Sequence, residues 1–207
     1  MKKLIWGLLS NKILRAIFFI NRQNELSNWK FEDNTNQAPH LLKQNLISYY
    51  RVKLNYSTLI ETGTYLGEMI LAQMNWFDKI YSIELDKKLY EYNKKQFANN
   101  YKIELIHGDS GKSLKLILDK INTPAVIFLD GHYSGGITAK GELMCPIYNE
   151  LDLIFQSIYP HLIIIDDRRL FNGNEDYPIY DDLIKYINTK KSNIKIELFD
   201  DLIILHQ

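Results

Sequence analysis

Residues 125–129 are Ala125-Val126-Ile127-Phe128-Leu129, an apolar run without a polar side chain. A second uninterrupted run, at 162–165, follows an amphipathic segment and reads Leu162-Ile163-Ile164-Ile165. Strands that carry helices on both faces of their sheet are buried on both sides, so they read as continuous apolar runs rather than alternating ones. The two runs therefore indicate strands of a mostly parallel sheet in an α/β protein.

Outward from these runs, short apolar segments alternate with amphipathic ones. The pattern predicts strands near 57–61, 79–84, 102–107, 124–130 and 161–166, with helices near 66–76, 87–98, 111–121, 142–158 and 179–189. The last two apolar runs, 194–199 and 202–206, are separated only by Asp200 and Asp201. Two residues are too few for a parallel crossover, so these two strands must be antiparallel neighbours.

The chain before residue 55 lies outside this alternation. In residues 1–20 the apolar side chains recur at helical spacing, with Lys12 and Arg15 on the other side, which indicates a basic amphipathic helix. Such a helix could rest on a membrane surface, or pack on the protein as a lid or dimer helix. Residues 21–38 are polar and read as a linker or mobile loop, and a further helix is expected from Pro39 to just before Asn55. We therefore divide the chain into an N-terminal helical extension or lid, 1–54, and one main domain, 55–207.

Composition limits the class of protein. The chain of 207 residues fits a single domain. Lys plus Arg and Asp plus Glu both total 25, so no overall positive charge favours nucleic acid as a partner. Cys145 has no second cysteine to pair with, which suits a reducing compartment such as the cytoplasm. With no adjacent base evident, Cys145 is interpreted as a small buried hydrophobe rather than a nucleophile.

A turn with two glycines follows the first expected strand. Its sequence is Glu61-Thr62-Gly63-Thr64-Tyr65-Leu66-Gly67-Glu68. Glycine lets the backbone approach a ligand closely, and the N–H groups at the start of a helix attract anionic groups. The turn therefore predicts a ligand site, although a tight strand-to-helix turn without a ligand would read the same way.

Polar side chains also follow the next two strands, where an open α/β sheet binds its ligands. Glu84 ends the second strand and could accept hydrogen bonds from both ribose hydroxyls of an adenosine. After the third strand, Asp109 could accept from an adenine amino group and Ser110 could donate to the ring. Asp109 could instead only cap the next helix, and His107 is interpreted as a structural histidine.

With their spacing, the segment 61–67, Glu84 and Asp109 resemble the cofactor motifs of class I S-adenosylmethionine-dependent methyltransferases. The resemblance covers roughly 55–207 and implies a Rossmann-like, mostly parallel seven-stranded sheet of order 3-2-1-4-5-7-6, with strand 7 antiparallel. It implies S-adenosylmethionine (SAM) as cofactor, S-adenosylhomocysteine (SAH) as product, and a set of cofactor-binding residues: Glu61, Gly63, Thr64, Tyr65, Gly67, Glu84, Asp109, Ser110 and Asp130. The Gly-x-Gly-x-x-Gly fingerprint of nicotinamide enzymes does not follow the first strand, which disfavours a dehydrogenase.

Three carboxylates follow the fourth and fifth strands: Asp130, Asp166 and Asp167. In this topology they meet at neighbouring strand ends, where they would repel one another unless a cation neutralised them. Mg²⁺ is the natural occupant, and Ca²⁺ or Mn²⁺ could replace it. The constellation is similar to the metal site of cation-dependent O-methyltransferases, including the macrocin-type sugar enzymes; catechol-type members usually carry Asn where this chain has Asp167. Capping and loop aspartates without a metal are the alternative.

His132 comes two residues after Asp130, and the two are the candidate catalytic residues. A cation lowers the pKa of a bound hydroxyl, and a neutral imidazole could then remove its proton. A structural histidine is the alternative. The glycine-rich segment 134–141 resembles a lid, and Lys140, Arg168 and Arg169 could hold an acceptor phosphate or carboxylate, or be solvated surface charges.

These residues predict a metal-assisted O-methyltransferase. Its acceptor would be a sugar, a glycan precursor or another small hydroxylated metabolite, including a phosphorylated or nucleotide-linked one. The alternatives are a methyltransferase that needs no metal, an adenine-dinucleotide oxidoreductase and a binding module without catalysis. A homodimer is also compatible with the sequence.

Overall fold

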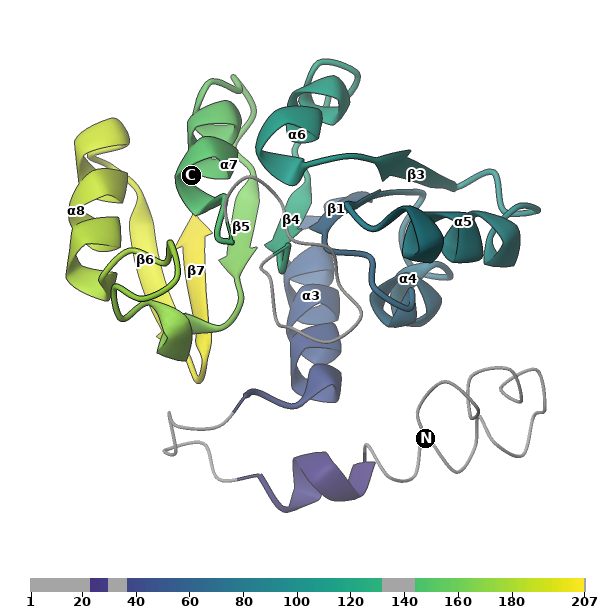
Figure 1. Ribbon diagram of the computed structural model, residues 1–207, viewed down its shortest axis with the longest axis horizontal. Coiled ribbons are helices and arrows are strands. Elements are labelled where there is room, and N and C mark those ends of the chain that lie inside the picture. Colours follow the sequence, from purple (N-terminus) through teal and green to yellow (C-terminus); the bar gives the residue numbers. More distant parts are fainter. Residues whose placement is uncertain (1–22, 30–36, 132–143, 207) are drawn as a thin grey trace.

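The computed structural model describes residues 23–29, 37–131 and 144–206, and every structural statement below concerns these residues (Figure 1). The chain forms a sheet whose strands are β1 Thr58–Thr62, β2 Lys79–Glu84, β3 Ile103–His107, β4 Val126–Leu129, β5 Leu162–Ile165, β6 Lys195–Phe199 and β7 Leu202–His206. The helices are α3 His40–Leu54, α4 Glu68–Gln73, α5 Lys87–Gln96, α6 Ser110–Leu118, α7 Ile147–Phe155, α8 Tyr180–Lys190 and the short 3-10 helix η1 Arg168–Leu170. Residues 23–27 form a further short helix, in the segment 21–38 that the sequence predicts as a linker or loop.

The order of strands in the seven-stranded sheet is β3-β2-β1-β4-β5-β7-β6. β7 is antiparallel to both β5 and β6, and the remaining neighbours are parallel. The predicted fold class, strand order and C-terminal hairpin are therefore confirmed. The centre of the sheet is in register at its carboxyl edge, because Leu129 of β4 pairs with Thr62 of β1 and with Ile165 of β5. Residues that follow these three strands emerge side by side.

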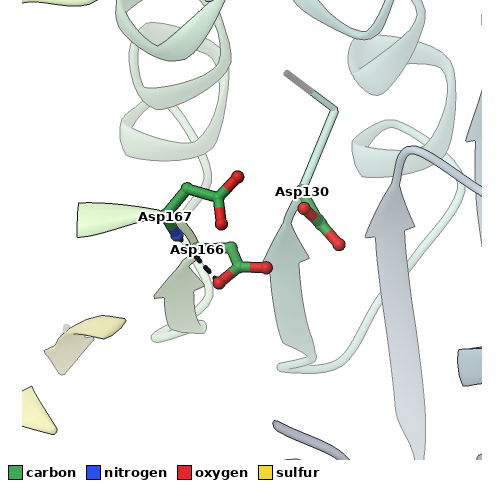
Figure 2. A group of neighbouring side chains, drawn as sticks. All are labelled: Asp130, Asp166 and Asp167. Atoms are coloured by element: carbon green, nitrogen blue, oxygen red, sulfur yellow. Dashed lines mark hydrogen bonds between the residues drawn. The ribbon is translucent and has the colours of Figure 1, made fainter. Parts of the chain in front are cut away.

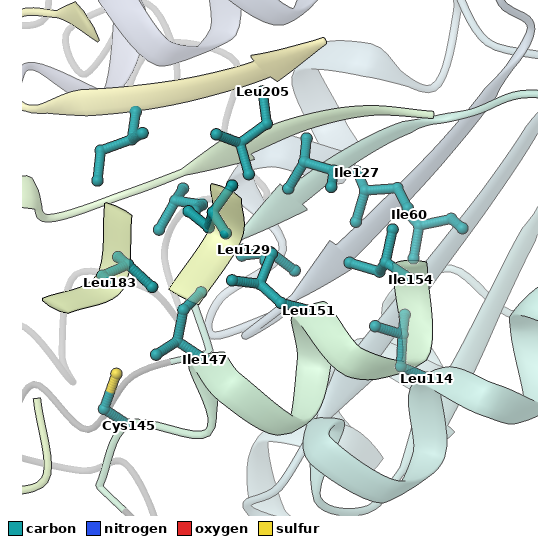
Figure 3. Packing of buried hydrophobic residues seen from close by; sticks show 14 of the residues in the cluster. Ile60, Leu114, Ile127, Leu129, Cys145, Ile147, Leu151, Ile154, Leu183 and Leu205 are labelled. Atoms are coloured by element: carbon teal, nitrogen blue, oxygen red, sulfur yellow. The ribbon is translucent and has the colours of Figure 1, made fainter. Parts of the chain in front are cut away.

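Helices cover both faces of the sheet. Strand β4 is apolar at every position because side chains on both of its faces are buried under these helices. Ile127 and Leu129 belong to a core cluster that includes apolar side chains of α6, α7 and α8 (Figure 3). Val126 and Phe128 point to the other face, into a cluster with apolar side chains of α3 and α4. Cys145 is buried in the first cluster, as expected for a small hydrophobe.

The helix expected after Pro39 is α3, and it packs on the sheet. Leu46, Ile47 and Tyr50 fill the second core cluster, and Asn55 ends the helix in the left-handed conformation, with φ 54°. Residues of α3 therefore contribute to the core although they precede the proposed boundary at 54/55. That boundary itself stays a prediction.

Two predicted helices begin later than expected. The helix expected at 66–76 is only α4, Glu68–Gln73, because Tyr65 and Gly67 have φ values of 48° and 75° and the turn continues to Gly67. The helix expected at 142–158 begins at Ile147, directly after Pro146, which lacks the N–H that a helix interior requires. Residues 142 and 143 lie outside the described part of the chain.

Within the described ranges, the structure contains no helix that is both long and apolar enough to cross a bilayer. The amphipathic helix expected in residues 1–20, with its membrane, lid or dimer role, lies outside these ranges. The same holds for His132 and for the glycine-rich segment 134–141 with Lys140. Predictions for these residues remain predictions.

Candidate active site

The glycine turn after β1 brings two strand ends into close contact. Gly63 has φ 83° and donates its N–H to the Ile83 carbonyl oxygen at 2.9 Å. A Cβ atom at Gly63 would lie only 2.4 Å from the backbone oxygen of Asp130. Thr64 also donates its N–H to Ile83, at 3.2 Å. Glycine is therefore required at residue 63, where the turn meets the segment that carries the first aspartate.

Glu84 is fixed at the end of β2 beside this turn. One of its carboxylate oxygens accepts from the Tyr65 N–H and the other from the Asp86 N–H, both at 2.8 Å. Burial raises the pKa of Glu84, and these backbone donors oppose that rise because they stabilise the charged form. The structure thus holds an acidic side chain at the place where the sequence predicts a ribose contact.

Glu61 lies deeper than the turn. Its carboxylate is buried and accepts a hydrogen bond from the Ser82 hydroxyl at 2.7 Å, and the Ser82 and Thr64 hydroxyl oxygens are 2.6 Å apart. Burial is the main reason that the pKa of Glu61 rises to about 8. This chain of hydrogen bonds joins β1, β2 and the turn. The predicted contact between Glu61 and a cofactor stays a prediction.

Asp109 and Ser110 stand where β3 passes into α6. Asp109 caps this helix, because its carboxylate accepts from the Gly111 N–H at 2.8 Å. Asp109 therefore caps the helix, and the adenine contact predicted for it stays a prediction. The His107 Nε2 atom lies 3.2 Å from the Leu85 carbonyl oxygen, and its ring packs beside Tyr90, as suits a structural histidine.

Glu150, an acidic residue of α7 close to the start of α6, was not predicted from the sequence. Its side chain is 0% exposed and lies near the hydroxyls of Ser110 and Thr62. Burial raises the pKa of Glu150 to about 7, although the two hydroxyls oppose the rise. An acid in the apolar stripe of a helix, between Ile147, Leu151 and Ile154, is the sequence signal that could have found it.

The raised pKa of Glu150 predicts a pH dependence of stability. The folded chain keeps a proton on Glu150 from about pH 4.5 to about 7, where the unfolded chain has lost it, so the free energy of unfolding should fall as the pH rises through this window. Glu150→Gln removes this ionisation and should raise the free energy of unfolding at pH 8 by about 1–3 kcal/mol. Urea unfolding across this pH range tests it. Glu91→Gln, at an exposed position of α5, is the control, and parallel pH profiles for Glu150→Gln and the wild type would contradict the prediction.

The three aspartates come together as the sequence predicts. Asp130 follows β4, and Asp166 and Asp167 follow β5 (Figure 2). One carboxylate oxygen from each lies within 4.8 Å of the others. Asp167 has φ 58°, and its N–H donates to one carboxylate oxygen of Asp166 at 2.8 Å. This tight turn places both carboxylates of the pair on the side of Asp130.

Two basic side chains face this cluster. Lys43, which comes from α3, forms an ion pair with the second carboxylate oxygen of Asp166. Arg169 donates to Asp167 at 2.8 Å and also pairs with Asp201, so it is not a solvated surface charge. Both contacts use the same guanidinium nitrogen, and the acceptor contact predicted for Arg169 stays a prediction. Sequence reasoning missed Lys43, although a lysine in the apolar stripe of α3, three residues before Leu46, is a visible anomaly.

The electrostatics of the cluster suit a divalent cation. Burial is the main cause that raises the pKa of both Asp130 and Asp166, and the neighbouring carboxylates raise it further. In the described part of the chain, the ion pairs of this cluster set the two cations of Lys43 and Arg169 against four carboxylates, those of the three aspartates and Asp201, if all four are ionised. Two negative charges would remain. Clustered carboxylate oxygens with this surplus are the donor set that Mg²⁺ or Ca²⁺ takes in proteins.

No protein-family model matches the sequence, and no curated protein matches it either. Solved structures do resemble the chain. An O-methyltransferase from Bacillus cereus, solved with SAH, has a TM-score of 0.60 at 14% identity, with 95% of this chain and 90% of that chain covered. TomG from Streptomyces achromogenes, an O-methyltransferase of tomaymycin synthesis solved with SAM, has a TM-score of 0.53 at 14% identity, with coverages of 89% and 85%.

A methyltransferase from Podospora anserina, PaMTH1, solved with SAH, has a TM-score of 0.51 at 16% identity. The match covers 90% of this chain and 85% of that chain. Each alignment spans most of both chains, whereas the identities are low. The likeness therefore concerns the arrangement of strands and helices, and it shows that this chain has the Rossmann-like fold of class I SAM-dependent methyltransferases.

Proposed function

We propose that the protein transfers a methyl group from SAM to an oxygen atom of a small acceptor, with the help of a divalent cation. The observation that carries the proposal is the contact between the glycine turn, where the cofactor would bind, and the segment that begins the aspartate cluster. The glycine turn after β1 touches the backbone of Asp130, and Asp130 begins the aspartate cluster. A cofactor on the turn would therefore lie next to an acceptor held at the cluster.

The turn, the last residue of β2 and the residues after β3 form the proposed cofactor site. Gly63, Thr64, Tyr65 and Gly67 would bring backbone close to the cofactor. Glu84, already oriented by two backbone N–H groups, would accept from the ribose hydroxyls. Asp109 and Ser110 would contact the adenine, and Glu61 would support the turn from below through Ser82.

The proposed cation ligands are Asp130, Asp166 and Asp167. When bound there, a divalent cation lowers the pKa of an acceptor hydroxyl and orients its oxygen. We propose that His132 takes the hydroxyl proton. The acceptor oxygen then forms a bond to the methyl carbon as the carbon–sulfur bond breaks, its electron pair stays on sulfur, and SAH is left.

The acceptor class rests on the aspartate pair, which resembles that of the sugar methyltransferases. We therefore propose a sugar, a glycan precursor or another small hydroxylated metabolite. An acceptor phosphate or carboxylate would bind to Lys140, Arg168 or Arg169, and the contacts of Arg169 with Asp167 and Asp201 both use a single guanidinium nitrogen.

Glu84→Gln tests the cofactor site separately from the cation site. The substitution keeps the size of the side chain and removes its charge, so SAH should bind about 10- to 100-fold more weakly, as for the loss of charge-assisted hydrogen bonds. Isothermal titration with SAH measures the change, and thermal unfolding checks that the variant folds. Glu91→Gln should bind like the wild type. Equal affinity in Glu84→Gln would remove Glu84 from the site.

The reaction is tested by incubating the protein with labelled SAM and a panel of hydroxylated acceptors, with Mg²⁺ or with a chelator. Label transfer that requires Mg²⁺ is the expected result. Transfer that survives chelation would favour a methyltransferase without a metal. Binding of a nicotinamide dinucleotide in place of SAH would indicate an oxidoreductase, and binding of neither would indicate a non-catalytic module.

A further inference from the structure

The chain already supplies two positive charges to the aspartate cluster, Arg169 at Asp167 and Lys43 at Asp166. Lys43 is 3% exposed, and its ammonium group pairs with Asp166, which is 0% exposed. A buried ammonium is costly unless it is paired, so the folded chain keeps Lys43 on Asp166 as long as no cation is bound. The helix that carries Lys43 is held to the sheet by the core residues Leu46, Ile47 and Tyr50.

The contact also uses the oxygen of Asp166 that a cation would need. One carboxylate oxygen of Asp166 accepts the Asp167 N–H at 2.8 Å, and Lys43 occupies the other. Asp130 and Asp167 each have an oxygen within 4.8 Å of an Asp166 oxygen, so the ammonium borders the space between the three carboxylates. A divalent cation bound there would meet a like charge in a poorly solvated place.

We propose that Lys43 competes with the divalent cation for Asp166 and thereby sets the affinity of the site for metal. This inference rests on the proposed function, because it assumes that a cation binds the three aspartates. Lys43 is a positioning residue: it holds Asp166 in place while the cation is away, and the cation binds by displacing its ammonium from that oxygen.

Removal of the positive charge should therefore tighten metal binding. Lys43→Met keeps an unbranched side chain of similar length without the charge, and Mn²⁺ should bind at least about tenfold more tightly than to the wild type. Without a cation the same variant leaves Asp166 buried and unpaired, so it should unfold at a lower temperature than the wild type. Saturating Mn²⁺ should then raise its unfolding temperature by more than it raises that of the wild type.

The experiment measures free Mn²⁺ by electron paramagnetic resonance during titration of the wild type, Lys43→Met and Lys43→Gln. Lys43→Gln can still donate a hydrogen bond to Asp166, so it keeps the test open if Lys43→Met fails to fold. Lys53→Met, at an exposed position of the same helix, is the matched control and should bind Mn²⁺ like the wild type. Asp130→Asn in the Lys43→Met background should weaken binding again, which assigns the ion to this cluster.

The proposal is supported if Lys43→Met and Lys43→Gln bind Mn²⁺ more tightly than the wild type while Lys53→Met does not. It is also supported if these two Lys43 variants bind Mn²⁺ and the wild type does not. Equal dissociation constants in the wild type and both variants would overturn it while leaving the cation site intact. Absence of Mn²⁺ binding in every variant would overturn both the competition and the cation part of the proposed function. SAH titration of the same samples separates these results from a failure of the cofactor site.

Discussion

Asparagine in place of Asp130 is expected to lower the rate of methyl transfer at least about a thousandfold. The cation that activates the acceptor would lose one of its three proposed carboxylate ligands. SAH affinity should change by less than about threefold, since the turn and Glu84 are left intact. Single-turnover assays with saturating labelled SAM and Mg²⁺ measure the rate, and isothermal titration measures SAH affinity.

The stability of this variant separates chemistry from folding. Burial and the neighbouring carboxylates raise the pKa of Asp130, so the charged form is costly, and Asp130→Asn should unfold at the same temperature as the wild type or higher. Asp78→Asn is the control, because Asp78 is exposed and precedes β2 at the opposite edge of the sheet. Turnover within a factor of about ten of the wild type would contradict the role of Asp130.

Alanine in place of Gly63 should destabilise the fold by at least about 3 kcal/mol and abolish SAH binding. A left-handed φ of 83° costs a non-glycine residue about 1–2 kcal/mol, and the new Cβ would lie 2.4 Å from the Asp130 backbone oxygen, which cannot move without shifting β4. Urea unfolding measures the loss.

Gly108→Ala provides a matched comparison for this substitution. A Cβ atom there would also meet an atom at 2.4 Å, but that atom is the Ser113 hydroxyl oxygen, which can rotate away. We expect a loss of less than about 1 kcal/mol for Gly108→Ala. Similar losses in the two variants would show that the contact between the turn and Asp130 is not what constrains Gly63.

The sheet could be predicted because a strand that is buried on both faces has an apolar residue at every position. Val126 to Leu129 and Leu162 to Ile165 are apolar at every position, and the structure buries each of them. The strand order came from the resemblance rather than from these runs. Helix starts were less predictable, because the left-handed residues Tyr65 and Gly67 delay α4 without changing the apolar pattern.

Part of the candidate site could be predicted for a similar reason. Asp130, Asp166 and Asp167 directly follow strands, so the parallel topology alone brings them to one edge of the sheet. Lys43 and Glu150 reach the site from helices, and their contacts depend on how those helices pack. A charged residue in an apolar stripe signals burial, but it does not identify the partner.

Crystals of the protein with SAH, soaked in millimolar Mn²⁺, would show whether a cation binds beside the cofactor. We expect an anomalous peak coordinated by Asp130, Asp166 and Asp167, with SAH on the turn that contains Gly63. Well-ordered SAH without an anomalous peak between these aspartates would contradict a cation-assisted transfer.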